Sequence, residues 1–154
     1  MGGDALGTAV AGRQMAIILD ADVIIRGEKG TFALQEWLAG RPDDDFEIAA
    51  ITVAELWHGV ERARGRRRRE REQYLETVLA PMPVVDYTRA IAREHARIWA
   101  ELEAAGRMSG YYDVIVAATA RHRGSELATL NQAHFKDIAG LRLVDWTAGG
   151  IEIP

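Results

Sequence analysis

Residues 16–24 decide the fold, and they read Ala-Ile-Ile-Leu-Asp-Ala-Asp-Val-Ile. A short, unbroken apolar run of this kind is typical of a strand that is buried on both faces of a sheet. Two carboxylates, Asp20 and Asp22, follow where this strand would end. Because ligands of open α/β sheets bind beyond the carboxyl ends of the strands, the stretch predicts a functional site at Asp20. The alternative is that these aspartates only cap the next helix.

Strand-like and helix-like segments alternate along the rest of the chain. A long amphipathic helix is expected from Thr88 to Ala105, and a helix of small apolar residues is expected to follow Gly110. This alternation predicts an α/β fold, a three-layer α/β/α sandwich around a five-stranded, mostly parallel sheet. Besides 16–19, the expected strands are residues 46–51, 84–85, 127–130 and 141–144.

Length and composition restrict the class of protein. The chain has 154 residues, a net charge of −4 and no cysteine, which allows one domain with a real core and excludes disulfides, thiolate catalysis and Cys-zinc sites. It lacks a long apolar run and a signal-peptide pattern, so we expect a cytoplasmic protein without a membrane segment. The expected organisation is a disordered or loosely packed leader at 1–14, one folded domain at 15–147 and a tail at 148–154.

Two more carboxylates, Glu55 and Asp113, occupy positions that match Asp20 in such a fold. Glu55 follows the expected strand 46–51, and Asp113 lies in the first turn of an apolar helix. Each has a structural alternative. Thr52 and Glu55 have the spacing of a capping box, which would turn Glu55 back onto the helix start. An acid such as Asp113 is favoured in a first turn by the helix dipole alone.

The functional interpretation brings Asp20, Glu55 and Asp113 together in one crevice. Clustered carboxylates resist ionisation unless a cation lies among them. Ligation by oxygen alone suits Mg²⁺ or Mn²⁺, and such an ion can activate water for attack on a phosphodiester. The pattern therefore favours metal-dependent hydrolysis of a phosphodiester.

An arginine run lies between two of these carboxylates. It has two interpretations: a solvated helix in which the arginines pair with Glu70 and Glu72, or a basic face that contacts RNA phosphates. The candidate RNA-binding residues are Arg66, Arg67, Arg68 and Arg69.

Four motifs, in this order and at these spacings, resemble the PIN-domain ribonucleases, specifically the VapC-type toxins of VapBC toxin–antitoxin systems. The resemblance implies a five-stranded parallel sheet and a Mg²⁺- or Mn²⁺-dependent endoribonuclease. It also implies an RNA substrate such as tRNA or rRNA, inhibition by a cognate VapB-type antitoxin, and a homodimer. The motifs are residues 19–24, residues 51–56 with Gly59, residues 113–120 and residues 129–135.

The resemblance also assigns roles by position. The fourth acidic position of the family falls around Asn131, which brings no charge and leaves open whether one or two metal ions bind. His134 stands where some relatives carry another acid. Thr129 matches a hydroxyl position that orders water or phosphate, and Asp22 is a supporting candidate. The residues that match the family's metal-binding acids are Asp20, Glu55 and Asp113.

Two other functions compete with this one. A haloacid-dehalogenase-type phosphatase would use Asp20 as nucleophile and Asp22 as acid–base. It needs a downstream lysine followed by an aspartate pair, and no such pair follows Lys136, the last lysine. A non-catalytic PIN-like module that binds RNA or a partner is supported only by Asn131.

Overall fold

The sheet has five strands, and every pairing between them is parallel. The computed structural model describes residues 16–149 and 153–154, so the expected leader at 1–14 lies outside the described residues. The strand order is β3-β2-β1-β4-β5, which confirms the predicted sheet. The strands are β1 (Ile17–Leu19), β2 (Phe46–Ala49), β3 (Val84–Val85), β4 (Glu126–Ala128) and β5 (Arg142–Leu143).

The central strand β1 is covered on both faces, as its apolar sequence predicts. Ile17 and Leu19 belong to one apolar core and Ile18 to a second core across the sheet. All three side chains are at most 1% exposed. An apolar residue is therefore needed at every position of this strand, which explains why the sequence does not alternate.

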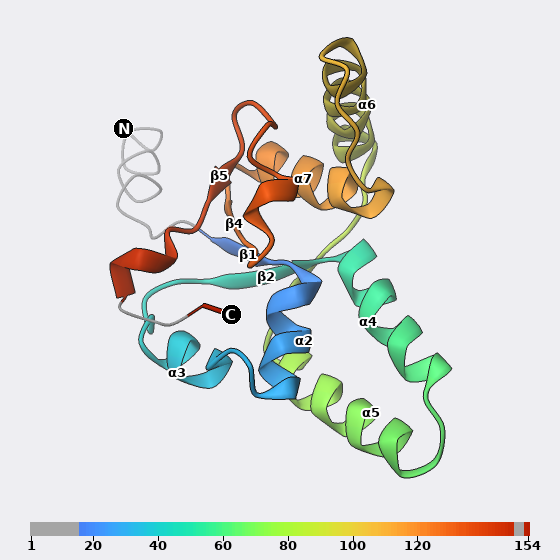
Figure 1. The fold of residues 1–154 in the computed structure, drawn as a ribbon, viewed down its shortest axis with the longest axis vertical. Helices are drawn as coiled ribbons and strands as arrows, with labels where there is room; N and C mark the ends of the chain where they lie inside the picture. The colour runs from blue at the N-terminus through green and yellow to red at the C-terminus, as the bar shows by residue number, and fades with distance from the viewer. Residues whose placement is uncertain (1–15, 150–152) are drawn as a thin grey trace, which may run out of the picture.

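Helices form the two outer layers. Figure 1 shows α6 and α7 on one side of the sheet and α2 and α3 on the other. The first core also receives residues from α4 and α5. The helices are α2 (Ala21–Lys29), α3 (Leu34–Ala39), α4 (Ala50–Arg62), α5 (Gly65–Leu79), α6 (Arg89–Ala104) and α7 (Tyr111–Arg123), with short 3₁₀ turns η1 (Gln132–His134) and η2 (Trp146–Gly149).

The predicted long helix is confirmed as α6, because the Thr88 hydroxyl accepts the N–H of Ile91 at 3.2 Å and caps it. The predicted capping box is wrong. Helix α4 begins at Ala50, so Thr52 lies inside the helix, fully buried, and its hydroxyl has no hydrogen-bond partner in the described part of the chain. Alanine favours helix strongly, and Ala50 starts the helix earlier than the threonine. Glu55 is therefore in the second turn and is not tied to the helix start.

The topology places the carboxyl ends of β1 and β4 side by side. From β1 the chain builds β2 and β3 on one side, and it then returns through α6 and α7 to place β4 on the other side (Figure 1). The strand order thus reverses between β1 and β4, which is where α/β sheets bind ligands. Among the described residues, no helix has the length and apolar character needed to cross a membrane.

Candidate active site

Asp20 directly follows β1 and is held by both of its carboxylate oxygens. Oδ1 accepts the N–H of Ala21 at 2.9 Å, so Asp20 does cap α2. Oδ2 accepts the hydroxyl of Thr129 at 2.9 Å, which joins the ends of β1 and β4. Asp20 is only 7% exposed and Thr129 is fully buried. The capping role and the site role therefore use different oxygens of the same side chain.

Asp22, in the first turn of α2, faces the same strand end. Its Oδ2 accepts the backbone N–H of Leu130 at 3.1 Å. Its Oδ1 is buried, and no hydrogen bond to it is present in the described part of the chain. Since buried carboxylate oxygens are normally bonded, this atom is an acceptor available to a ligand at this edge of the sheet.

The backbone of Thr129 is held in place by Trp146, the first residue of η2. Its carbonyl accepts the indole N–H of Trp146 at 2.9 Å, and Trp146 is 4% exposed. The Trp146 ring packs on Trp37 and Phe32, with centroids 4.9 and 5.2 Å away. Sequence analysis missed this brace. The only signal was an indole after the fifth strand, because a buried indole N–H needs an acceptor.

Asp113 and Glu55 lie close enough to interact through their charges, and Asp113 also interacts with Asp20 in this way. Asp113 lies in the first turn of α7, and its charge raises the pKa of both Glu55 and Asp20. Burial is the larger cause of the raised pKa of Glu55. The structure therefore places all three predicted carboxylates at one edge of the sheet, close enough for their charges to interact.

Burial dominates the electrostatics of Asp20 and Asp22 at the start of α2. Burial, helped by the charges of Asp22 and Asp113, raises the pKa of Asp20 to about 7, although the hydrogen bonds from Thr129 and Ala21 oppose it. Burial also raises the pKa of Asp22. A carboxyl group so placed releases its proton readily only when a positive charge is near.

Asn131 and His134 flank Asp113. Nδ1 of His134 lies 3.1 Å from Oδ2 of Asp113, and Nδ2 of Asn131 lies 2.9 Å from the same ring nitrogen. The backbone N–H of Asn131 also bonds to the Thr129 hydroxyl at 3.1 Å. The Asp113 and Asp20 groups of side chains are thus connected through the loop after β4.

The chemistry of these donors fits a hard divalent cation. Among residues 16–149, no three His, Cys, Asp or Glu side chains converge tightly enough to hold a metal as they stand. A cation would nevertheless relieve two unfavourable features of these oxygens. The carboxylates repel one another, and Oδ1 of Asp22 is a buried acceptor without a donor among the described residues. An oxygen-rich set of this kind suits Mg²⁺ or Mn²⁺.

The arginine run forms the outer face of α5. Arg66 pairs with Glu70 at 2.8 Å and Arg68 with Glu61 at 3.2 Å, which agrees in part with the ion-pair interpretation. Arg67 and Arg69 are exposed and make no ion pair or hydrogen bond within the described ranges. These two side chains are therefore the ones available to a polyanion.

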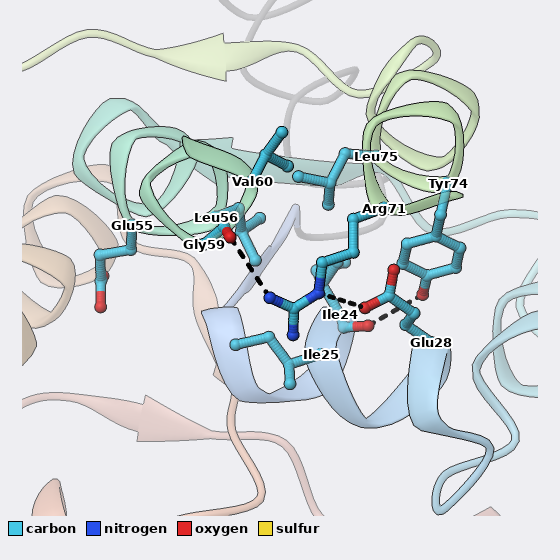
Figure 2. Close-up of a pocket in the computed structure, with 10 residues that line it drawn as sticks. All are labelled: Ile24, Ile25, Glu28, Glu55, Leu56, Gly59, Val60, Arg71, Tyr74 and Leu75. Carbon is cyan, nitrogen blue, oxygen red and sulfur yellow. Dashed lines mark hydrogen bonds and ion pairs between the residues drawn. The ribbon is translucent and has the colours of Figure 1, made fainter. Parts of the chain in front are cut away.

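A small cavity of about 50 Å³ lies between α2, α4 and α5, and Glu55 is one of the residues that line it (Figure 2). Arg71 crosses it, donating to the Gly59 carbonyl at 3.3 Å and pairing with Glu28 at 3.4 Å. The Tyr74 hydroxyl donates to the Ile24 carbonyl at 2.8 Å. Figure 2 shows Arg71 in the middle of this lining, between Glu55 and Tyr74. Sequence analysis did not single out Arg71 or Tyr74.

A family model for the PIN domain matches residues 17–141. The chain belongs to the PIN-domain family. Among its relatives in that family, the tRNA(fMet)-specific endonuclease VapC of Shigella flexneri is 34% identical over 100 residues, which cover 65% of this chain and 74% of that protein. Ribonuclease VapC10 of Mycobacterium tuberculosis is 33% identical over 120 residues, or 77% and 85% of the two chains.

Solved PIN-domain structures confirm the fold. The crystal structure of DNA-bound VapBC from Salmonella typhimurium has a TM-score of 0.78 and 28% identity, covering 86% of this chain and 99% of that one. These similarities confirm the VapC-type resemblance on which the sequence interpretation depends.

Proposed function

We propose that this PIN-domain protein is a divalent-metal-dependent endoribonuclease of the VapC type. The observation that carries the proposal is that Asp20, Glu55 and Asp113 lie within electrostatic range of one another, because the charge of Asp113 raises the pKa of the other two. The names of the relatives, which are ribonucleases, support the substrate class. Since the substrates would be cellular RNAs, we place the activity in the cytoplasm.

In this proposal Asp20, Glu55 and Asp113 would hold Mg²⁺ or Mn²⁺. Bound there, such an ion would supply an activated water and would neutralise charge on the phosphodiester. Thr129 keeps Oδ2 of Asp20 in place by donating to it, and Asp22 ties the start of α2 to the loop after β4. Asn131 has no negative charge, so only the three carboxylates would balance the positive charge of the ion.

The proposed partners are RNA and a VapB-type antitoxin. A neutralising partner must cover the carboxylates, and the cavity beside Glu55 offers it apolar side chains on which to pack (Figure 2). Ile25, on the rim of this cavity, is 36% exposed. A homodimer remains a prediction, which light scattering on the purified chain would measure.

The test is RNA cleavage by antitoxin-free protein with Mn²⁺ or Mg²⁺. We expect cleavage that EDTA abolishes, and a loss of roughly 100-fold or more in Asp20→Asn and Asp113→Asn, because removing charge from a metal site costs several kcal/mol of transition-state stabilisation. Asp43→Asn, on an exposed loop, is the matched control and should cut normally.

Three results would contradict the proposal. Cleavage that persists in EDTA would contradict the proposed metal dependence. Cleavage by Asp113→Asn at the wild-type rate would contradict the proposed active site. Wild-type protein that binds RNA but leaves it intact with either ion would favour the non-catalytic module. Turnover of para-nitrophenyl phosphate with RNA left intact would favour the phosphatase.

A further inference from the structure

The start of α7 has no side chain at the point where the Asp113 carboxylate lies. Gly110 is the N-cap residue of α7, and no side chain caps the helix there. A Cβ added to Gly110 would lie 2.9 Å from Oδ2 of Asp113 and 3.4 Å from its Cγ. Non-bonded heavy atoms attract one another best at about 3.5–4.0 Å and repel when they are much closer. The carboxylate therefore occupies space that any residue other than glycine would need for its Cβ.

The backbone at Gly110 does not itself require glycine. Its φ of −57° and ψ of 142° are angles that any residue adopts. Gly106, by contrast, has a φ of 67°, which favours glycine for the sake of the backbone alone. Helix capping does not require glycine at position 110 either, because Ser, Thr, Asp and Asn are at least as good at an N-cap. The contact with Asp113 is thus the feature of the structure that explains a glycine here.

A second segment of the chain holds the same oxygen. Nδ1 of His134, in η1, lies 3.1 Å from Oδ2 of Asp113, and Nε2 of the same ring lies 3.3 Å from Nδ2 of Asn131. One neutral tautomer satisfies both neighbours, because Nδ1 donates to the carboxylate and Nε2 accepts from the amide. Within residues 16–149 no hydrogen bond reaches the other oxygen of Asp113, Oδ1, which is left for a ligand.

We propose that Gly110 and His134 are positioning residues that together fix the orientation of the Asp113 carboxylate. Gly110 acts by leaving room for Oδ2 at the start of α7, and His134 acts by donating to that oxygen from the loop after β4. Neither residue needs to touch the RNA. The inference deepens the proposed function and rests on it for the part that Asp113 plays in cleavage.

Two substitutions at position 110 separate positioning from helix capping. Gly110→Ala adds the Cβ alone, whereas Gly110→Ser adds the same Cβ with a hydroxyl that caps helices well. Because the Cβ would meet the end of a side chain, Asp113 can rotate away, and both variants should fold with a Tm within about 4 °C of wild type. RNA cleavage with Mn²⁺ should fall about 100-fold in both, since a misplacement of about 1 Å costs that much.

Gly40→Ala is the matched control. Gly40 also has a negative φ, −76°, and its added Cβ would lie 3.4 Å from the Glu36 carbonyl, which is an ordinary contact. It follows α3, which lies across the sheet from α7 (Figure 1). This variant should cleave RNA at the wild-type rate.

Nitrogen-15 NMR of the metal-free full chain in EDTA tests the orientation without RNA. At about pH 8.5, where ordinary histidine is neutral, the ring of His134 should be the Nδ1–H tautomer in wild type. Its signals are assigned by their loss in His134→Gln. Both Gly110 variants should shift His134 toward the Nε2–H tautomer, as should Asp113→Ala, because Nδ1 loses its acceptor. Gly40→Ala should keep the wild-type spectrum.

Three results would overturn the positioning role. They are cleavage by Gly110→Ala at the wild-type rate, cleavage that Gly110→Ser restores, which would indicate capping, or a His134 tautomer that neither Gly110 variant changes. The tautomer shift in a protein that never cuts RNA would refute the proposed function alone. Metal-dependent cleavage that both Gly110 variants retain would refute the positioning role alone.

Discussion

Asp20→Asn should make the metal-free protein more stable at alkaline pH. Burial and neighbouring charges raise the pKa of Asp20 from 3.8 to about 7 in the folded chain. At about 1.4 kcal/mol per pH unit, ionising Asp20 without a cation costs the fold about 4 kcal/mol. Asparagine avoids that cost but loses one of the two hydrogen bonds of Asp20, worth about 1–2 kcal/mol. The net gain should be about 2 kcal/mol.

The pH dependence gives this prediction its sign. The folded pKa of Asp20 lies above the unfolded one, so as pH rises from about 4 the unfolded chain loses this proton first. The unfolded state then binds fewer protons, and the free energy of unfolding falls until pH passes about 7. The advantage of Asp20→Asn should therefore be largest near pH 8 and smaller by about 2–3 kcal/mol at pH 5.

Thermal unfolding in EDTA, followed by circular dichroism, measures both effects. A gain of about 2 kcal/mol corresponds to a rise of roughly 4–8 °C in Tm for a chain of this size. Asp43→Asn should show no such rise, and added Mn²⁺ should stabilise the wild type but not Asp20→Asn. A variant that is no more stable than wild type at pH 8, or whose advantage is the same at pH 5, would refute the electrostatic reasoning.

Three further predictions concern other parts of the molecule. Gly27→Ala should destabilise the protein by about 1–3 kcal/mol in urea titrations, because its Cβ would lie 2.8 Å from the Leu34 side chain. Gly59→Ala should be neutral or stabilising, because its Cβ would lie 3.5 Å from the nearest atom, Nη1 of Arg71, which is an ordinary contact distance. Replacing Arg67 and Arg69 together with glutamine should weaken RNA binding, with Tm unchanged, and should flatten the salt dependence by about 0.7 for each phosphate that the variant no longer binds; an unchanged slope would exclude the interaction. At limiting Mn²⁺, RNA cleavage should fall below about pH 7 as protons compete for Asp20, and excess Mn²⁺ should move that fall to lower pH; a metal-independent profile would contradict it.

The strands and two of the acids were predictable because local sequence determines them. The apolar run before Asp20 requires a strand covered on both faces, and a parallel sheet places its end at the crevice. The position of Asp113 was predictable because it lies in the first turn of a helix whose start the sequence indicates. The start of α4 was not, because Thr52 and Glu55 have capping spacing and only the preference of Ala50 for helix decides against it.

The contacts that support the site could not be predicted from spacing. The bond of Asp22 to Leu130 and the bond of Trp146 to Thr129 join segments that are distant in the chain, and they depend on how β4 lies beside β1. The placement of His134 against Asp113 similarly follows from the short turn after β4. These contacts follow from the topology of the whole sheet, and no local sequence pattern predicts them.

The brace between Trp146 and Thr129 has a practical consequence for anyone who shortens this protein. A chain cut before Trp146 would still contain every proposed metal ligand, yet the carbonyl of Thr129 would lose its donor and the rings of Trp37 and Phe32 would lose a neighbour. Inactivity of such a fragment would then report a loosened support beneath Asp20 rather than a missing reactive group, so deletion mapping from this end should stop short of the indole.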